Sequence, residues 1–169
     1  MEDKITLNIA VLTISDTRTQ ETDKSGNLLV KLIQDTGHQV VEHLITKDNI
    51  YSIRRIISKW IDAKSINAVI TTGGTGVTGR DGTPEAVEVL LDKKIDGFGE
   101  IFRYLSYKKI KTSTVQSRAL AGVANSTYIF CLPGSPGACK DAWTDIIQHQ
   151  LDSNNKPCNL VELIPRLKD

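Results

Sequence analysis

The sequence predicts an α/β fold in three layers, with helices covering both faces of a mostly parallel sheet. Three observations indicate this class. Apolar runs typical of strands alternate with stretches whose apolar residues recur at helical spacing. Two of the apolar runs, residues 6–15 and 66–72, carry no charge, which is typical of strands buried on both faces. The distinctive polar and glycine-rich loops follow strands, and ligands in such folds bind beyond the carboxyl ends of the strands.

The first part of the chain predicts a strand, a helix and a second strand. Residues 6–15 (TLNIAVLTIS) are apolar or β-branched and uncharged, so they predict a buried strand, which a polar loop follows. Residues 27–36 predict a helix, because apolar residues recur at helical spacing and Gly37 follows as a stop. Residues 39–46 predict the second strand.

The next part predicts a helix, a third strand and another helix. Asp48 is expected to cap a helix whose apolar residues between 50 and 61 form one stripe. Residues 66–72 predict a third strand that runs into a glycine-rich loop. Thr83 is expected to cap the following helix, with Pro84 in its first turn, where the missing N–H costs nothing.

The last part is less regular. Residues 93–117 predict a short helix within DGFGEIFRYLSYKK. Two strands, residues 119–123 and 127–132, are expected to be joined by a turn at residues 125–126. Ser135-Pro136 repeats the arrangement of a capping residue followed by proline and opens a further helix, and the tail reads as mostly irregular.

The bulk composition favours a single domain and excludes several classes of partner. A length of 169 residues suits one domain spanning 1–169. A net charge of +1 gives no general field that would attract nucleic acid or an anionic membrane. No apolar run approaches the roughly 18 residues of a membrane span, and the N-terminus lacks the layout of a signal peptide. Three cysteines without a C-x-x-C pair favour a reducing, cytoplasmic location.

The stretch from Thr71 to Ala86, TTGGTGVTGRDGTPEA, indicates an anion site. It holds five glycines, and Asp81 lies just before a helix start. Glycines let backbone amides approach an anion closely, and a helix N-terminus offers unpaired N–H groups. We therefore predict a phosphate-bearing ligand held by backbone amides beside one carboxylate. The alternative is that the glycines only form a tight turn.

Two better-known phosphate loops fit this stretch poorly. Gly74, Gly76 and Gly79 match the letters of the dinucleotide fingerprint, but four residues separate them from the helix. Gly74 and Gly79 have the spacing of a Walker A loop, but Arg80-Asp81 stands in place of its lysine and hydroxyl residue. Neither a nicotinamide or flavin site nor a P-loop is predicted.

Four motifs identify a resemblance over nearly the whole chain. TTGGTGVTGRDGTPEA, DGFGEIFRYLSY, TSTVQSRALAGVAN and LPGSPGACKDAW occur in this order. Together they closely resemble the molybdenum cofactor biosynthesis protein B family, part of the MoaB/MogA group of molybdopterin-binding domains. The resemblance implies a three-layer fold, assembly into trimers or hexamers, and binding of molybdopterin. It also implies that active members use ATP with Mg²⁺ to adenylylate the terminal phosphate of molybdopterin, releasing pyrophosphate.

The resemblance implies ligand-binding roles for three groups of residues. They are Gly73, Gly74, Thr75 and Gly76 in the glycine loop, Ser113, Ser117 and Arg118 in the T-S-T-x-Q-S-R segment, and Pro133, Gly134, Ser135 and Pro136 in a second loop. It further implies that Asp81 is the essential acid and that Asp48 supports catalysis. At Gly76 we expect a positive φ beside the phosphate. Gly82 departs from the family pattern, because active members usually have a branched apolar residue there.

Asp48 and Asp81 are the candidate catalytic and metal-binding residues. Magnesium prefers oxygen ligands, often one or two carboxylates together with substrate phosphates. The alternative for Asp81 is a turn-stabilising or capping role, and for Asp48 it is helix capping. Asp16 follows the first strand and is expected either to face the same region or to be an ordinary loop aspartate. Arg80 and Arg118 are expected either to bind phosphate through bidentate hydrogen bonds or to be surface arginines.

The remaining reactive side chains predict structural roles. The three histidines, at positions 38, 43 and 149, fit no metal or catalytic-triad spacing. Cys131 and Cys139 are expected to be inert thiols in the core. Phe102, Tyr104 and Tyr107 are expected in the core or in subunit contacts. The sequence thus favours a molybdopterin adenylyltransferase, and the alternative is a catalytically silent molybdopterin-binding or scaffold protein in the same pathway.

Overall fold

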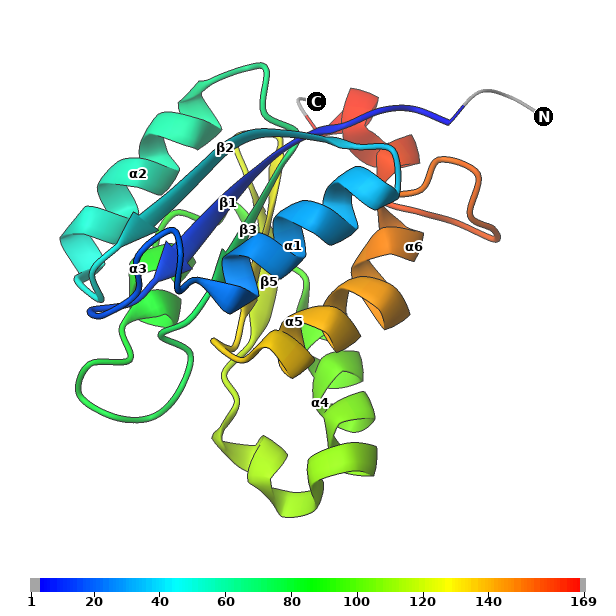
Figure 1. The fold of residues 1–169 in the computed structure, drawn as a ribbon. Coiled ribbons are helices and arrows are strands. Elements are labelled where there is room, and N and C mark those ends of the chain that lie inside the picture. Colours follow the sequence, from blue (N-terminus) through cyan, green and yellow to red (C-terminus); the bar gives the residue numbers. More distant parts are fainter. Residues whose placement is uncertain (1–3, 168–169) are drawn as a thin grey trace.

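The computed structural model describes residues 4–167, which form one six-stranded sheet with helices on both faces (Figure 1). The spatial order of the strands is β2-β1-β3-β6-β5-β4. The four strands from β2 to β6 in that order are mutually parallel, and β5 and β4 each run antiparallel to their neighbour. The predicted three-layer, mostly parallel α/β fold is confirmed. The strands are β1 (Asn8–Ile14), β2 (Gln39–Thr46), β3 (Ala68–Thr72), β4 (Lys93–Lys94), β5 (Leu120–Ala124) and β6 (Thr127–Leu132).

The helices follow the predicted alternation. They are α1 (Lys24–Asp35), α2 (Ile50–Asp62), α3 (Thr83–Glu88), α4 (Asp96–Ile110), α5 (Pro136–Ala142) and α6 (Gln148–Gln150), with 3₁₀ segments η1 (Lys111–Gln116) and η3 (Val161–Arg166). A π-helical stretch, η2 (Trp143–Ile147), joins α5 to α6. Helix α4 packs on the sheet through Phe98 and Phe102, and in Figure 1 its far end and the segment that follows it extend below the sheet. No helix in the described part of the chain is both long and apolar enough to cross a bilayer.

Alternation of side chains along the strands builds two separate cores. In β1, Ile9 and Val11 face one side, where they pack with α1, α4, α5 and η2. Ala10 and Leu12 face the other side, where they pack with α2 and α3. Because β1, β3 and β6 are covered on both faces, their carboxyl ends are held rigidly at one edge of the sheet. The loops that leave this edge form the site described below.

Three helix starts differ from the sequence prediction. Helix α1 begins at Lys24 rather than near residue 27, because Asp23 caps it by accepting a hydrogen bond from Gly26 N. Its first turn has no large apolar residue, although Ser25 and Gly26 are buried, so apolar spacing could not reveal it. Helix α2 is capped by Asn49 and not by Asp48. Helix α3 already includes Thr83 as its first residue, and the Thr83 hydroxyl donates to Gly73 O instead of capping.

The region after α3 is more regular than predicted. Helix α4 has 15 residues, longer than the short helix expected, and the two-residue strand β4 was not predicted. The spacing of α4 is hard to read because Phe98 and Phe102 are buried while Ile101, Tyr104 and Tyr107 on the same helix are exposed. The predicted turn at residues 125–126 is confirmed, with positive φ at both residues.

Candidate functional site

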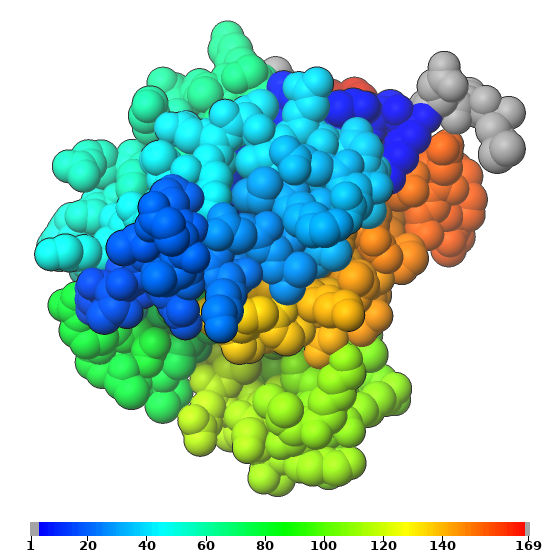
Figure 2. All heavy atoms as spheres, in the orientation of Figure 1, coloured from blue at the N-terminus to red at the C-terminus, as the bar shows by residue number. Residues whose placement is uncertain are grey.

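The loops after β1, β3 and β6 enclose a cleft of about 540 Å³ at the carboxyl edge of the sheet. Segment η1 and the end of α4 form its outer wall, and Figure 2 shows the surface hollowed between the green glycine loop and the yellow-green wall. Ten residues expected at the site line this cleft: Gly73, Gly74, Thr75, Gly76, Asp81, Ser113, Ser117, Pro133, Gly134 and Ser135. Three others expected there, Asp48, Arg118 and Pro136, are not part of its lining.

The glycine loop is bent by glycines at its start. Gly73 and Gly74 have φ values of +106° and +67°, a region that L side chains rarely adopt. A Cβ on Gly73 would lie 2.2 Å from Ile14 O. The expected positive φ at Gly76 is wrong, but a Cβ on Gly76 would lie 2.7 Å from Asp81 Oδ2. The loop therefore needs glycine at Gly76 for space and at Gly73 and Gly74 for conformation.

The second loop packs directly on the first. A Cβ on Gly134 would lie 3.3 Å from Gly73 Cα, so the two glycines bring the backbones together. Ser135 caps α5 by accepting a hydrogen bond from Ala138 N, as predicted. Pro136 occupies the first turn of α5 rather than the cleft. The cleft floor is thus made of two backbone segments and a helix start.

Asp81 lines the cleft as an ionised carboxylate. Its Oδ2 accepts hydrogen bonds from Thr78 Oγ1 at 2.6 Å and from Thr78 N at 2.8 Å. The hydrogen bond from the Thr78 hydroxyl lowers the pKa of Asp81 below its usual value. The same contacts fix the direction of the carboxylate. Asp81 therefore presents a fixed negative charge next to the glycine loop.

Asp48 lies beside the glycine loop, outside the cleft. Its Oδ1 accepts a hydrogen bond from Gly82 N at 3.1 Å. A Cβ on Gly74 would lie 2.8 Å from Asp48 Oδ2. Burial raises the pKa of Asp48, and the nearby carboxylates of Asp81 and Asp16 raise it further. The nearby guanidinium of Arg80 acts in the opposite direction and lowers the pKa of Asp48.

The space beside Gly82 is already filled. A Cβ there would lie 2.8 Å from Cγ2 of Ile50 at the start of α2. In this chain, Ile50 thus occupies the volume that a branched residue at position 82 would need.

The two arginines expected to meet phosphate are both engaged by protein groups. Arg80 forms a bidentate ion pair with Asp16, with Nη2 at 2.7 Å from each carboxylate oxygen. This pair connects the loop after β3 with the loop after β1. Arg118 contacts Glu85 and the backbone of the glycine loop. Neither guanidinium lines the cleft.

Arg18 is the arginine that lines the cleft, and sequence reasoning missed it. Its backbone N donates to Ser15 Oγ at 3.2 Å, and its Nη1 donates to Thr22 O at 2.9 Å. Thr17 and Ser25 also line the cleft from the same part of the chain. The sequence signal for Thr17 and Arg18 was their position shortly after the first strand, at the edge of the sheet where ligands bind.

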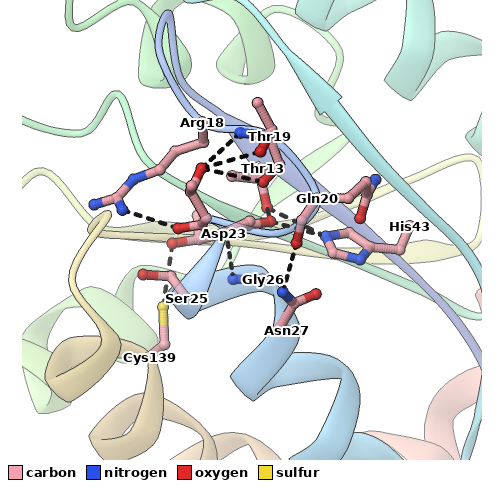
Figure 3. A network of polar contacts seen from close by, with 12 residues as sticks. Thr13, Arg18, Thr19, Gln20, Asp23, Ser25, Gly26, Asn27, His43 and Cys139 are labelled. Carbon is pink, nitrogen blue, oxygen red and sulfur yellow. Dashed lines mark hydrogen bonds and ion pairs between the residues drawn. The ribbon is translucent and has the colours of Figure 1, made fainter.

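A buried polar network anchors this first loop. Asp23 Oδ2 accepts a hydrogen bond from Thr13 Oγ1 at 2.6 Å and lies 3.0 Å from His43 Nε2 (Figure 3). Ser25 Oγ donates to Gly134 O at 2.8 Å, which ties the first loop to the second. Buried polar groups that are hydrogen-bonded in this way fix one conformation. The wall that carries Arg18 is therefore attached to the sheet and to the floor of the cleft.

The donor set fits a hard cation that is shared with a ligand, and not a closed protein cage. Within residues 4–167 no group of three or more His, Cys, Asp and Glu side chains is arranged to hold a metal ion. Asp48 offers a carboxylate oxygen next to Gly74, and Asp81 offers one next to Gly76. Magnesium is usually bound by one or two carboxylates, with phosphate oxygens and waters completing its shell. These two carboxylates would suit Mg²⁺ bound together with a phosphorylated ligand.

Comparison with known proteins identifies the family. A family model described as a probable molybdopterin binding domain matches residues 10–153. The chain belongs to the molybdopterin binding domain family. The resemblance inferred from the four motifs is confirmed.

Relatives of this molybdopterin binding domain match it along most of its length. It is 50% identical over 155 residues to molybdenum cofactor biosynthesis protein B of Escherichia coli K12, covering 92% of this chain and 91% of that protein. A crystal structure of a molybdenum cofactor biosynthesis protein B gives a TM-score of 0.84 at 44% identity, covering 87% and 92% of the two chains. The tungsten cofactor synthesizing protein MoaB from Pyrococcus furiosus gives 0.80 at 31% identity, covering 97% and 98%. Family membership assigns the chain to molybdenum cofactor biosynthesis.

The histidines and cysteines of this molybdopterin binding domain stay outside the cleft lining. Burial raises the pKa of Cys131 to about 12 and that of Cys139 to about 11, so both thiols are inert, as predicted. His38 is buried and accepts a hydrogen bond from Leu7 N, while His43 contacts Asp23. His149 is exposed. The prediction of structural or solvated histidines is confirmed.

Proposed function

We propose that the chain binds molybdopterin in the 540 Å³ cleft and uses ATP with Mg²⁺ to adenylylate its terminal phosphate. The observation that supports this most is the meeting of two glycine loops at one cleft, with Asp81 on its edge. Backbone amides in such loops, together with the N-terminus of α5, favour a phosphate group. A volume of this size suits a pterin with its phosphate.

The proposed reaction is an in-line transfer at phosphorus. An oxygen of the molybdopterin phosphate attacks the α-phosphorus of ATP, and the bond from that phosphorus to the bridging oxygen of the β-phosphate breaks. Pyrophosphate leaves with the electron pair, and no general base is needed because the attacking phosphate is already largely ionised near neutral pH. The main demands on the protein are positioning and charge stabilisation. The glycine loops would fix the attacking phosphate, and Asp81 and Asp48 would hold Mg²⁺, which supplies charge neutralisation on the ATP phosphates.

A catalytically silent molybdopterin-binding protein is the second candidate, and one contact favours it. Both hydrogen bonds to Asp81 Oδ2 come from Thr78 in the same turn, which is what a purely turn-stabilising aspartate would show. Incubation with molybdopterin, ATP and Mg²⁺ separates the two candidates. The enzyme forms adenylylated molybdopterin and pyrophosphate and stops when the metal is chelated. The silent protein binds the pterin without forming either product.

Arg18→Gln should weaken the binding of molybdopterin about tenfold or more. Arg18 is the cation in the described cleft lining, and hydrogen bonds between charged groups contribute about 1.5–3 kcal/mol. The affinity should be measured by titration at two salt concentrations, with the exposed Arg55→Gln on α2 as the control. Equal affinities for wild type and Arg18→Gln would exclude Arg18 from the site.

We also propose that the chain assembles into trimers or hexamers. Helix α4 and segment η1 expose apolar side chains on a part of the molecule that projects from the sheet (Figure 1). These side chains are Ile101, Tyr104, Tyr107, Ile110 and Val115. Exposed apolar patches of this kind mark protein contacts. Light scattering at micromolar concentration should give a trimer or hexamer mass, and a monomer mass would contradict the proposal.

A further inference from the structure

Arg118 donates hydrogen bonds to the glycine loop on both sides of its exposed tip, residues 77–80. Its backbone N donates to Thr75 O at 3.0 Å. Its side chain donates from Nε to Gly76 O at 2.7 Å and from Nη2 to Asp81 O at 2.8 Å. The residues between these two carbonyls, 77–80, are exposed. The guanidinium therefore bridges the base of an otherwise solvent-exposed loop.

Glu85 holds the guanidinium in this position. It contacts Arg118 Nη1 through Oε1, and its Oε2 lies 3.3 Å from Nη2. Hydrogen bonding from Arg118 lowers the pKa of Glu85, so the pair is charged. Each of the three guanidinium nitrogens thus contacts a protein oxygen. Glu85 belongs to α3, the helix that begins directly after the loop, so the pair connects the loop to a fixed element.

We propose that Arg118, held by Glu85, is a positioning residue that fixes the anion-binding shape of the glycine loop and does not itself bind the phosphate. This inference rests on the proposed function for the identity of the ligand. Backbone amides bind an anion well only when they are already oriented, because ordering a loop upon binding costs free energy. The bonds to Gly76 O and Asp81 O fix the two peptide groups on either side of the loop tip. Arg118 would also hold the backbone of Asp81 in its place beside the cleft.

The Arg118→Lys and Arg118→Gln variants separate positioning from direct charge. Lysine keeps the positive charge but cannot reach Gly76 O, Asp81 O and Glu85 together, because its ammonium is a single point charge. If Arg118 positions the loop, both variants should weaken molybdopterin binding by about tenfold, equivalent to about 1.4 kcal/mol. Turnover at saturating molybdopterin should also fall, because the backbone of Asp81 is released. Near-normal affinity in Arg118→Lys would show that charge alone matters and would overturn the proposal.

Two glutamate-to-glutamine substitutions on α3, one at Glu85 and one at Glu88, provide the matched control. Glu85→Gln removes the ionic partner of Arg118 and should weaken molybdopterin binding severalfold. Glu88→Gln, three residues further along α3, removes an exposed ion pair with Lys94 at 3.3 Å and should change the affinity much less than Glu85→Gln does. Equal effects of the two substitutions would show that the result reflects helix charge and not the support of Arg118, which would overturn the proposal.

Amide hydrogen exchange of the unliganded chain tests whether Arg118 orders the glycine loop, and this test does not depend on the proposed function. Amides of residues 73–82 should exchange about tenfold faster in Arg118→Gln than in wild type, while those of β1 and β3 stay protected. Unchanged exchange together with lost affinity would mean that Arg118 contacts the ligand itself, which contradicts the inference. If wild type fails to bind molybdopterin, the proposed function fails, and exchange alone then decides whether Arg118 orders the loop.

Discussion

Asp81→Asn should lower the rate of adenylyl transfer by at least about a hundredfold, while the affinity for molybdopterin stays the same or improves. The substitution keeps the size of the side chain and removes its charge. The amide oxygen of Asn can still accept the hydrogen bond from Thr78 N that now reaches Asp81 Oδ2 at 2.8 Å, so the turn should persist. The lost charge is the one that would hold Mg²⁺ against the ATP phosphates. Removing one well-placed electrostatic contact to a transition state costs about 10²–10³ in rate.

This prediction needs the binding constant and the product rate on the same protein preparation. Asp35→Asn is the control, because Asp35 makes only an exposed ion pair with Lys31 on α1, remote from the cleft. An unchanged rate in Asp81→Asn would remove Asp81 from the mechanism. Loss of both binding and rate would instead show that Asp81 shapes the loop, as the contacts with Thr78 allow.

Gly76→Val should weaken molybdopterin binding by about tenfold or more in a chain that still folds. A Cβ at this position would lie 2.7 Å from Asp81 Oδ2 and 3.0 Å from its Cγ, so either the carboxylate or the loop backbone must move. The branched side chain would also occupy part of the cleft where the phosphate approaches the amides. Loss of one hydrogen bond to a charged group costs about 1.5–3 kcal/mol, which corresponds to at least a tenfold loss of affinity.

Gly79→Val is the matched control for this substitution. A Cβ on Gly79 meets no atom within 4 Å, and its φ lies outside the positive region. Both variants add the same side chain to the same loop, yet only Gly76 faces Asp81 and the cleft. Titration with molybdopterin should show weaker binding in Gly76→Val alone. Equal affinities for both variants and wild type would reduce the loop to a simple turn.

The fold was predictable from the sequence because local pattern and tertiary packing agree in the first half of the chain. Strands β1 and β3 are uncharged runs, and they are buried on both faces. Helix α2 keeps a single apolar stripe, with Ile53, Ile57 and Trp60 buried. The apolar pattern of the sequence did not predict the structure where tertiary contacts bury polar residues or leave apolar residues exposed. In the polar first turn of α1, Ser25 is buried and bonded to the second loop, and α4 has apolar side chains on an exposed face as well as on the buried one.

The candidate site was only partly predictable, because sequence identifies residue types but not their partners. The glycines and Asp81 could be placed from the strand, loop and helix order alone. Nothing in the sequence shows that Arg80 is held by Asp16 and Arg118 by Glu85, since these pairs span 64 and 33 residues. Nor could it show that Asn49 caps α2 and leaves the carboxylate of Asp48 to Gly82. Long-range pairing therefore decides which charged side chains a ligand in the cleft can reach. Among Arg18, Arg80 and Arg118, only Arg18 lines the cleft.

The most direct test of the account is whether the purified wild-type chain converts molybdopterin and ATP to adenylylated molybdopterin. The reaction should contain Mg²⁺, and the adenylylated pterin and pyrophosphate should be quantified separately. The account predicts that both products form in equal amounts, that neither forms when magnesium is chelated, and that both form at least about a hundredfold more slowly in Asp81→Asn. A wild-type chain that binds molybdopterin tightly and forms neither product would contradict the proposed reaction and support the silent binding protein.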